Sequence, residues 1–440
     1  MAIRWRRRIL AYFKRRPTRN QRVETKVPRT LLTNVRIFDG TGQAPFAGEV
    51  LIQDDRIVQV ARVSDPVIAS TDAQVVSGGG ATLMPGMVEA HAHLSWPSSI
   101  ERFIPQFVLP PEEQLLATVR NARVLLESGF TSAYSAGALG ERIEVVVRDE
   151  IDGGWTPGPR LRASTIERSP EGDPMATGDI HHGRGPEAIK AFVRFCKDIG
   201  IDQVKLQISG EDALLPGSSQ HILYTEEEAQ AAGEQARESD IWLSAHTQAS
   251  EAIKMALRAG VRVLYHCTYA DAEALDMLEA RKDEIFVAPA IGVIVATLEA
   301  TPPPHIDMSG MKAAAVPVIE LSKKLIPELK RRGVRVLPGG DYGFPFNPNG
   351  TNARDLQHFV DLFGYTPTEA LVAATKLGGE LMGRGHELGL IQPGYLADLL
   401  LVDGDPTQDV SILQNRAKLL MIMKGGKMHK APPANLGQAA

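Results

Sequence analysis

Eight short β-rich runs alternate with helical segments between about Leu83 and Arg384, and this alternation constrains the fold most strongly. The runs are "TLMPGMVEAHAH", "FTSAYSA", "RLRASTIE", "QVKLQIS", "IWLSAHT", "VRVLYHCT", "IFVAPAI" and "VRVLPGGD". Helical apolar spacing separates them, as in "GPEAIKAFVRFCKDIG", and Thr225 followed by Glu228 predicts a capped helix start. Such repeats indicate an α/β fold, the (β/α)8 TIM barrel, whose chemistry lies at the C-terminal ends of its strands.

The two flanks of the barrel have a different pattern. Residues 29–82 and 386–430 hold short strand-like pieces between turns, and neither flank is long enough for a comfortable core of its own. We therefore expect one small β-sandwich domain assembled from both flanks, beside a barrel over 83–385. A basic arm over 1–28 precedes them, and a flexible tail over 431–440 follows.

Composition excludes several classes of protein. A hydrophobic content of 43% and a charged content of 23% are ordinary for a soluble globular protein, and the net charge of −5 argues against a general nucleic-acid binder. Two cysteines provide no disulfide framework and favour a reducing, cytoplasmic location. No segment after residue 26 approaches the roughly 18 consecutive apolar residues that are needed to cross a bilayer.

The N-terminal arm is strongly basic, with ten Lys or Arg against one Glu in residues 1–26. Its apolar stretch "ILAYF" is too short for a secretory signal. Three interpretations stay open: a basic amphipathic helix on an anionic membrane surface, a strap holding the acidic body of a neighbouring subunit in a homo-oligomer, or a solvated tail.

Polar residues within the first and fourth runs point to a site. His91 and His93 project from the same face of a strand, about 7 Å apart and within reach of one ion. In "QVKLQIS", alternation places Lys205 opposite the apolar residues and therefore in the barrel mouth. An unpaired ammonium there is costly to desolvate, and burial lowers its pKa.

Three further polar residues lie at or near the ends of later runs. His246 lies near the end of the fifth, His266 near the end of the sixth, and Asp341 ends the last. Taken singly, a strand-end histidine is usually a hydrogen-bonded core residue, and an aspartate after two glycines is usually a turn or helix cap. Six such residues at the same ends of the strands together predict a metal site.

With these residues the chain resembles the metal-dependent amidohydrolase superfamily, the relatives of urease and dihydroorotase, over nearly its whole length. "LMPGMVEAHAH" and "GLIQPGYLADLLLVDGDP" are also similar to hallmarks of that family. The resemblance implies two divalent ions, one held by His91, His93 and Asp341 and the other by His246 and His266, with Lys205 carboxylated by CO₂ to a bridging carbamate. Zinc is the default ion for such ligands, and cobalt, manganese and iron also fit.

The implied reaction is hydrolysis of the C–N bond of a small, largely apolar or aromatic amide, carbamates and ureas included. The resemblance implies attack by metal-activated hydroxide, and Asp341 is expected to be the general base and acid. "LPGGDYGF" looks like a branch that hydrolyses phenylureas and thiocarbamates. "TGDIHHGRG" is similar to a stretch in imidodipeptidase and ochratoxin-hydrolase relatives that act on dipeptides or N-acyl amino acids. We therefore expect His182, or its neighbour His181, to contact the small-molecule substrate.

Aromatic residues follow the first and last strands, namely Trp96, Phe103, Phe107, Tyr342, Phe344 and Phe346. They are expected to shape an apolar pocket, with Tyr342 contacting substrate; packing of the loops alone is the open alternative. A phosphotriesterase or lactonase would use the same metal site, and a non-catalytic scaffold would share the fold. The complete ligand set argues against the scaffold. A deaminase would usually carry Glu soon after the fifth-strand histidine, which "HTQAS" lacks.

Overall fold

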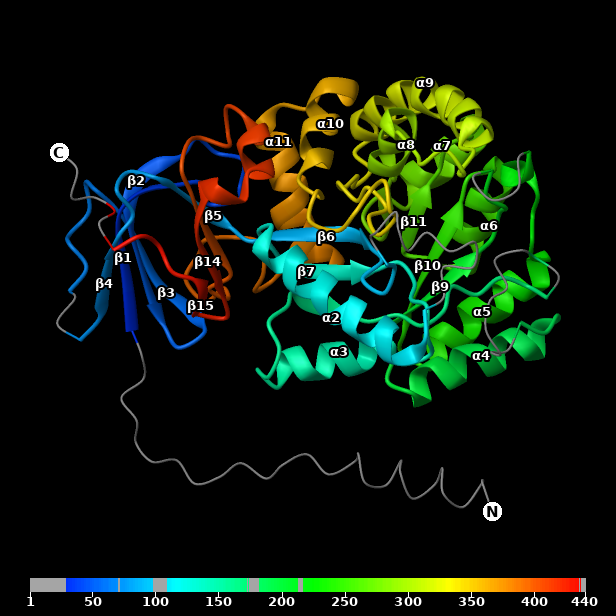
Figure 1. Cartoon of the computed structure of the whole chain (residues 1–440), viewed down its shortest axis with the longest axis horizontal. Helices are drawn as coiled ribbons and strands as arrows, with labels where there is room; N and C mark the ends of the chain where they lie inside the picture. The colour runs from blue at the N-terminus through cyan, green and yellow to red at the C-terminus, as the bar shows by residue number, and fades with distance from the viewer. Residues whose placement is uncertain are drawn as a thin grey trace, which may run out of the picture.

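The structure is a computed structural model that describes residues 29–69, 72–97, 109–171, 173, 182–212, 217–434 and 436. The predicted basic arm over 1–28 and the predicted pocket residues Phe103 and Phe107 lie outside the described residues. The described chain forms a β-sheet unit at one end and a larger α/β body at the other (Figure 1).

An eight-stranded sheet combines both flanks of the chain, with blue and red strands side by side in Figure 1. Its order is β15-β14-β13-β5-β1-β2-β3, and β4 pairs separately with β1. The strands are Arg29–Ile37 (β1), Phe46–Gln53 (β2), Arg56–Arg62 (β3), Gln74–Ser77 (β4), Thr82–Pro85 (β5), Leu399–Val402 (β13), Leu419–Lys424 (β14) and Lys427–Lys430 (β15). Buried Ile37, Leu83 and Leu399 share one core cluster in this sheet. Leu436, from the segment predicted as a flexible tail, packs against the same cluster.

The run "TLMPGMVEAHAH" is not one strand but two. Gly86 separates β5, which pairs with β1 and β13, from β6 (Met87–Ala92), which pairs with a strand of the α/β body. The Gly86 amide donates to the Asp398 carbonyl, and a Cβ at Gly86 would lie 2.1 Å from Thr131 Oγ1. Only glycine fits this crossing, so the small sheet extends to Pro85, beyond the predicted boundary at residue 82.

The α/β body contains parallel strands that follow one another in chain order. They are β6, Phe130–Ser135 (β7), Arg160–Arg162 (β8), Gln203–Gln207 (β9), Trp242–Thr247 (β10), Val263–His266 (β11) and Phe286–Ala288 (β12). Two parallel sheets result, β6-β7-β8 and β9-β10-β11-β12. Every residue of β6, β7, β9, β11 and β12 is buried, as in parallel sheets covered on both faces.

Helices flank these strands (Figure 1). They are Pro111–Glu127 (α2), Ile143–Asp152 (α3), Pro186–Asp198 (α4), Glu226–Glu238 (α5), Ser250–Ala259 (α6), Ala272–Ala280 (α7), Ile291–Glu299 (α8), Ser309–Arg331 (α9), Arg354–Phe363 (α10), Pro367–Val372 (α11) and Gly378–Leu381 (α12). The predicted capping box is confirmed, because Thr225 and Glu228 exchange hydrogen bonds at the start of α5. Among the described residues, none of the helices combines the length and apolarity needed to span a membrane.

Single parallel bridges link the two sheets. The bridged pairs are Arg168 with Leu206, Val336 with Val287, and Tyr342 with Ala92. The eighth predicted strand, 334–341, therefore lies between β12 and β6 but forms only isolated bridges in the described chain, and this corrects the prediction of a regular strand. Pro338 has no amide proton and two glycines follow it, which explains why the ladder stops after Leu337 donates to Val287.

Candidate metal centre

The six predicted ligands converge at the C-terminal ends of the parallel strands. They are His91 in β6, His93 just beyond it, Lys205 in β9, His246 in β10, His266 at the end of β11, and Asp341 after the eighth run. None is more than 8% exposed. The rings of His91 and His266 are 5.6 Å apart, and those of His246 and His266 are 4.3 Å apart, so the residues form one buried cluster.

His91, His93 and Asp341 form a first group of donor atoms. Asp341 Oδ1 lies 3.5 Å from His91 Nε2 and 3.1 Å from His93 Nε2. Donor atoms bound to one tetrahedral zinc ion stand about 3.3–3.6 Å apart, since zinc bonds to N and O are about 2.0–2.2 Å. His93 Nδ1 lies 3.0 Å from the Gly137 carbonyl oxygen. In a neutral ring this nitrogen donates, which leaves the lone pair of Nε2 facing Asp341.

The electrostatics of the cluster favour neutral imidazoles. Burial, and then the charge of Lys205, lowers the pKa of His246 to about 3 and that of His91 well below 6.5. Burial, His246 and Lys205 likewise hold the pKa of His266 well below 6.5. Neutral imidazole is the form that binds metals. Asp341 Oδ1 has no hydrogen-bond partner among the described residues, so this donor set fits a cation.

A second group contains Glu211, His246 and His266, whose donor atoms all lie within 4.8 Å of one another. Glu211 Oε2 lies 3.6 Å from His246 Nε2 and accepts a 3.0 Å hydrogen bond from Gln248. His246 Nε2 is also 3.2 Å from the Gly210 carbonyl oxygen. Glu211 was not among the residues predicted from the sequence. The available signal was an acidic residue four positions after the end of β9, at the same end as the histidines.

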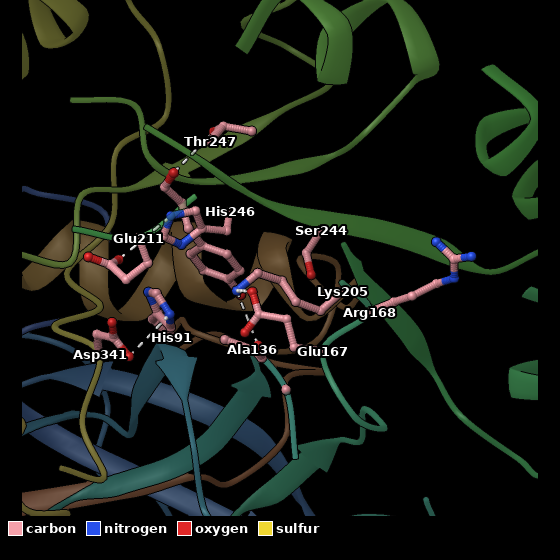
Figure 2. Close-up of polar contacts among 12 residues, drawn as sticks. His91, Ala136, Glu167, Arg168, Lys205, Glu211, Ser244, His246, Thr247 and Asp341 are labelled. Atoms are coloured by element: carbon pink, nitrogen blue, oxygen red, sulfur yellow. Dashed lines mark hydrogen bonds and ion pairs between the residues drawn. The ribbon is translucent and has the colours of Figure 1, made fainter. Parts of the chain in front are cut away.

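Lys205 points into this cluster, as alternation along its strand predicted (Figure 2). Its Nζ donates to the Ala136 carbonyl oxygen at 3.2 Å, forms an ion pair with Glu167 Oε1 at 3.2 Å, and lies 4.4 Å from the centre of the Tyr265 ring. The neighbouring Arg168 points away from the cluster (Figure 2). Sequence reasoning also missed Glu167, although it is the last residue of the third β-rich run.

Two of the histidine and carboxylate donors have unusual backbone conformations. Asp341 has a φ of 59° and His266 a φ of 69°, both in the left-handed region that residues with a side chain rarely adopt. Conformations of this kind persist where the surrounding structure holds them, and they concentrate at functional sites. One donor from each group is therefore held in a strained position.

Aromatic residues line the first group. The Trp96 ring stacks on His93 with centroids 4.0 Å apart and meets Phe344 edge-on at 4.5 Å. Phe346 stacks on Phe344 at 5.4 Å. Trp96, Phe344 and Phe346, three of the four predicted pocket aromatics that the structure describes, thus come together beside His93, which places apolar surface next to the donors.

The two predicted substrate contacts have other partners in this structure. Tyr342 is fully buried, and its hydroxyl donates to Asp355 Oδ1 at 3.3 Å. His182 is partly buried, with Nδ1 2.6 Å from the Ser169 carbonyl oxygen. The alternative contact, His181, lies outside the described residues. Contact of either Tyr342 or His182 with substrate stays a prediction.

The sequence and the fold resemble those of known proteins. The profile of the Amidohydrolase family matches residues 82–429. Ochratoxinase of Aspergillus niger is 24% identical over 439 residues, covering 93% of this chain and 88% of that protein. Its crystal structure has a TM-score of 0.77 at 22% identity and covers 94% of this chain and 99% of that chain.

Two other solved structures have the same fold. A Xaa-Pro dipeptidase with bound methionine has a TM-score of 0.79 at 24% identity, with 92% of this chain and 100% of that chain covered. Phenylurea hydrolase B has a TM-score of 0.72 at 19% identity, with 94% and 98% covered. The predicted family and its neighbouring branches are confirmed. The chain belongs to the amidohydrolase family, with its TIM-barrel fold, and is a hydrolase that acts on carbon–nitrogen bonds.

Proposed function

We propose that this protein is a binuclear-metal amidohydrolase that cleaves the C–N bond of a small, largely apolar or aromatic amide. The class includes N-acyl amino acids, dipeptides, carbamates and ureas. The observation that carries the proposal is the pair of adjoining donor groups, in which every residue except the half-buried Glu211 is buried, with Lys205 pointing into the same cluster. The proposal includes a barrel closed through residues 334–342 and a separate β-domain formed by the flanks.

Each candidate ligand has a role in the proposed centre. His91, His93 and Asp341 would hold one ion, and His246 and His266 the other. Lys205, as a carbamate, would offer two oxygens to both ions in place of an ammonium group. This added negative charge would face Glu167, which now pairs with Lys205 at 3.2 Å, so the two cations must offset it. Bound divalent ions, zinc by default, lower the pKa of water and polarise a carbonyl group.

Asp341 is the proposed proton carrier. Its Oδ1 lacks a hydrogen-bond partner in the described chain and lies at the edge of the cluster, where the Asp341 side chain is 11% exposed. A carboxylate so placed can accept a proton from the attacking water and return it to the leaving nitrogen. His93, held through Nδ1 by the Gly137 carbonyl, keeps its ring oriented toward Asp341 during that transfer.

The surroundings of the donors support an apolar substrate. Trp96 and Phe344 offer aromatic surface beside His93, and such surface favours an aromatic or aliphatic substituent next to the scissile bond. The names of the relatives support the same bond type, because a dipeptidase cleaves an amide and a phenylurea hydrolase cleaves a urea. We therefore place the reaction at a carbonyl carbon bonded to nitrogen.

A substrate panel tests this proposal. Full-length protein reconstituted with zinc is assayed on aryl amides, N-acyl amino acids, dipeptides, phenylureas, a lactone and a phosphotriester, with the Asp341→Asn protein as matched control. The proposal predicts turnover of at least one C–N substrate that the control lacks. Turnover confined to the lactone or the phosphotriester would identify the alternative hydrolase class. Absence of all turnover by a zinc-loaded protein would favour the scaffold alternative.

A further inference from the structure

A loop that the proposed mechanism does not use contacts the segments that carry the first donor group. This loop, 347–352, reads "NPNGTN" and contains three asparagines, each at most 6% exposed. We propose that these asparagines are positioning residues that fix His91, His93 and Asp341 for metal binding. The inference rests on the proposed binuclear centre.

Asn347 holds the segment of the aspartate. Its Nδ2 donates to the Asp341 carbonyl oxygen at 3.0 Å and to the Gly340 carbonyl oxygen at 2.9 Å. Asp341 has the left-handed φ of 59°, a conformation that its own backbone does not favour. Because the Asn347 amide binds the carbonyls of the two peptide units that flank the Asp341 Cα, it helps to keep the Asp341 carboxylate directed at the two histidines.

Asn349 and Asn352 hold the histidine strand. Asn349 Nδ2 donates to the His93 carbonyl oxygen at 3.2 Å. Asn352 Nδ2 donates to Glu89 Oε2 at 2.7 Å, and Glu89 Oε1 accepts the His91 backbone amide at 2.9 Å. These contacts join positions 256 and 263 residues apart in the chain. One six-residue loop therefore binds the backbone of all three donors, directly or through Glu89.

In the described chain, the Nδ2 hydrogen bonds given above for Asn347, Asn349 and Asn352 go to segments of the first group. In the second group, the His246 ring is held by the Gly210 carbonyl and lies beside Glu211, which Gln248 binds. Residues that orient ligands typically change metal affinity about 10–100-fold when they are removed. Loss of one asparagine amide should therefore lower the affinity for the ion of the first group and leave the affinity for the other ion unchanged.

The test measures metal binding rather than turnover. Metal-free, full-length wild type and the Asn347→Ala, Asn349→Ala and Asn352→Ala variants are titrated with Co²⁺, and both heat and visible absorption are recorded. Asn415→Ala is the matched control, because Asn415 is exposed and its side chain accepts only a local amide bond from Ala417 among its recorded contacts. We expect one Co²⁺ to bind about 10–100-fold more weakly in each loop variant, with an altered absorption band, and the control to match wild type.

Urea unfolding of the metal-free proteins separates positioning from general stability. Lower stability with unchanged Co²⁺ affinities and spectrum would overturn the inference, as would wild-type binding in all three loop variants. Should an alanine variant not fold, the serine variant at the same position replaces it and is judged by the same criteria. Wild type that binds no Co²⁺ would instead refute the proposed binuclear centre itself.

Discussion

Replacing Lys205 by methionine should strongly destabilise the metal-free protein. The Lys205 Nζ and Glu167 Oε1 atoms are 3.2 Å apart, and the two side chains are 1% and 13% exposed. At an effective dielectric constant of about 20, their attraction is about 5 kcal/mol before desolvation is subtracted. Methionine keeps most of the side-chain volume but leaves the Glu167 carboxylate buried without its cation. Breaking one partner of a buried pair typically costs about 3–5 kcal/mol, and we expect that loss in the free energy of unfolding.

Urea unfolding of metal-free protein in CO₂-depleted buffer measures this loss. The Glu167→Gln variant and the Glu167→Gln/Lys205→Met double variant complete a cycle, and the double variant should recover about 2 kcal/mol relative to Lys205→Met. Lys330→Met is the matched control, because Lys330 and Glu369 form a 2.7 Å pair whose side chains are 33% and 43% exposed. The free energy of unfolding of this control should fall by less than about 1 kcal/mol. A Lys205→Met protein as stable as this control would refute the buried pair.

Two further substitutions test the site, and a third tests Glu144, a buried carboxyl group of helix α3. Asp341→Asn should keep most of the bound metal but lower kcat about 10²–10⁴-fold, and metal analysis with steady-state kinetics checks both; near-normal kcat would contradict the proton-transfer role. Trp96→Ala should raise KM for an aromatic amide about tenfold with less effect on kcat, because its ring stacks on His93; unchanged KM would count against the aromatic pocket. Burial raises the pKa of Glu144 from 4.5 to about 8, so the folded state binds this proton more tightly than the unfolded chain. The stabilisation that this group contributes is complete below about pH 4.5 and is lost as the pH rises through 8. From pH 5 to pH 8, the free energy of urea unfolding should therefore fall less for Glu144→Gln than for wild type, and equal falls would refute the assignment.

The positions of the donor side chains followed from local sequence rules. Strand alternation alone directed Lys205 into the cluster, because a side chain opposite the apolar face of a barrel strand points inward. The strand-end positions of His246 and His266 likewise placed them side by side, with rings 4.3 Å apart. Lys205 and His246 lie within regular strands, where the direction of a side chain follows from alternation along the strand.

Other features depended on contacts between distant segments. The eighth run has apolar residues typical of a strand, but Pro338 and the glycines after it interrupt the ladder. Tyr342 was expected to contact substrate, which stays a prediction; the hydrogen bond of its hydroxyl to Asp355 in α10 could not be read from the sequence. The partners of Asn349 and Asn352 lie more than 250 residues away, and no local pattern specifies such pairs.

The metal content of the protein tests the central claim most directly. Full-length protein is loaded with zinc in bicarbonate buffer, freed of unbound ions and analysed by elemental mass spectrometry, with the Lys205→Met variant treated in parallel. The account predicts about two ions per wild-type chain and fewer in the variant. A wild-type chain that retains no zinc would contradict it.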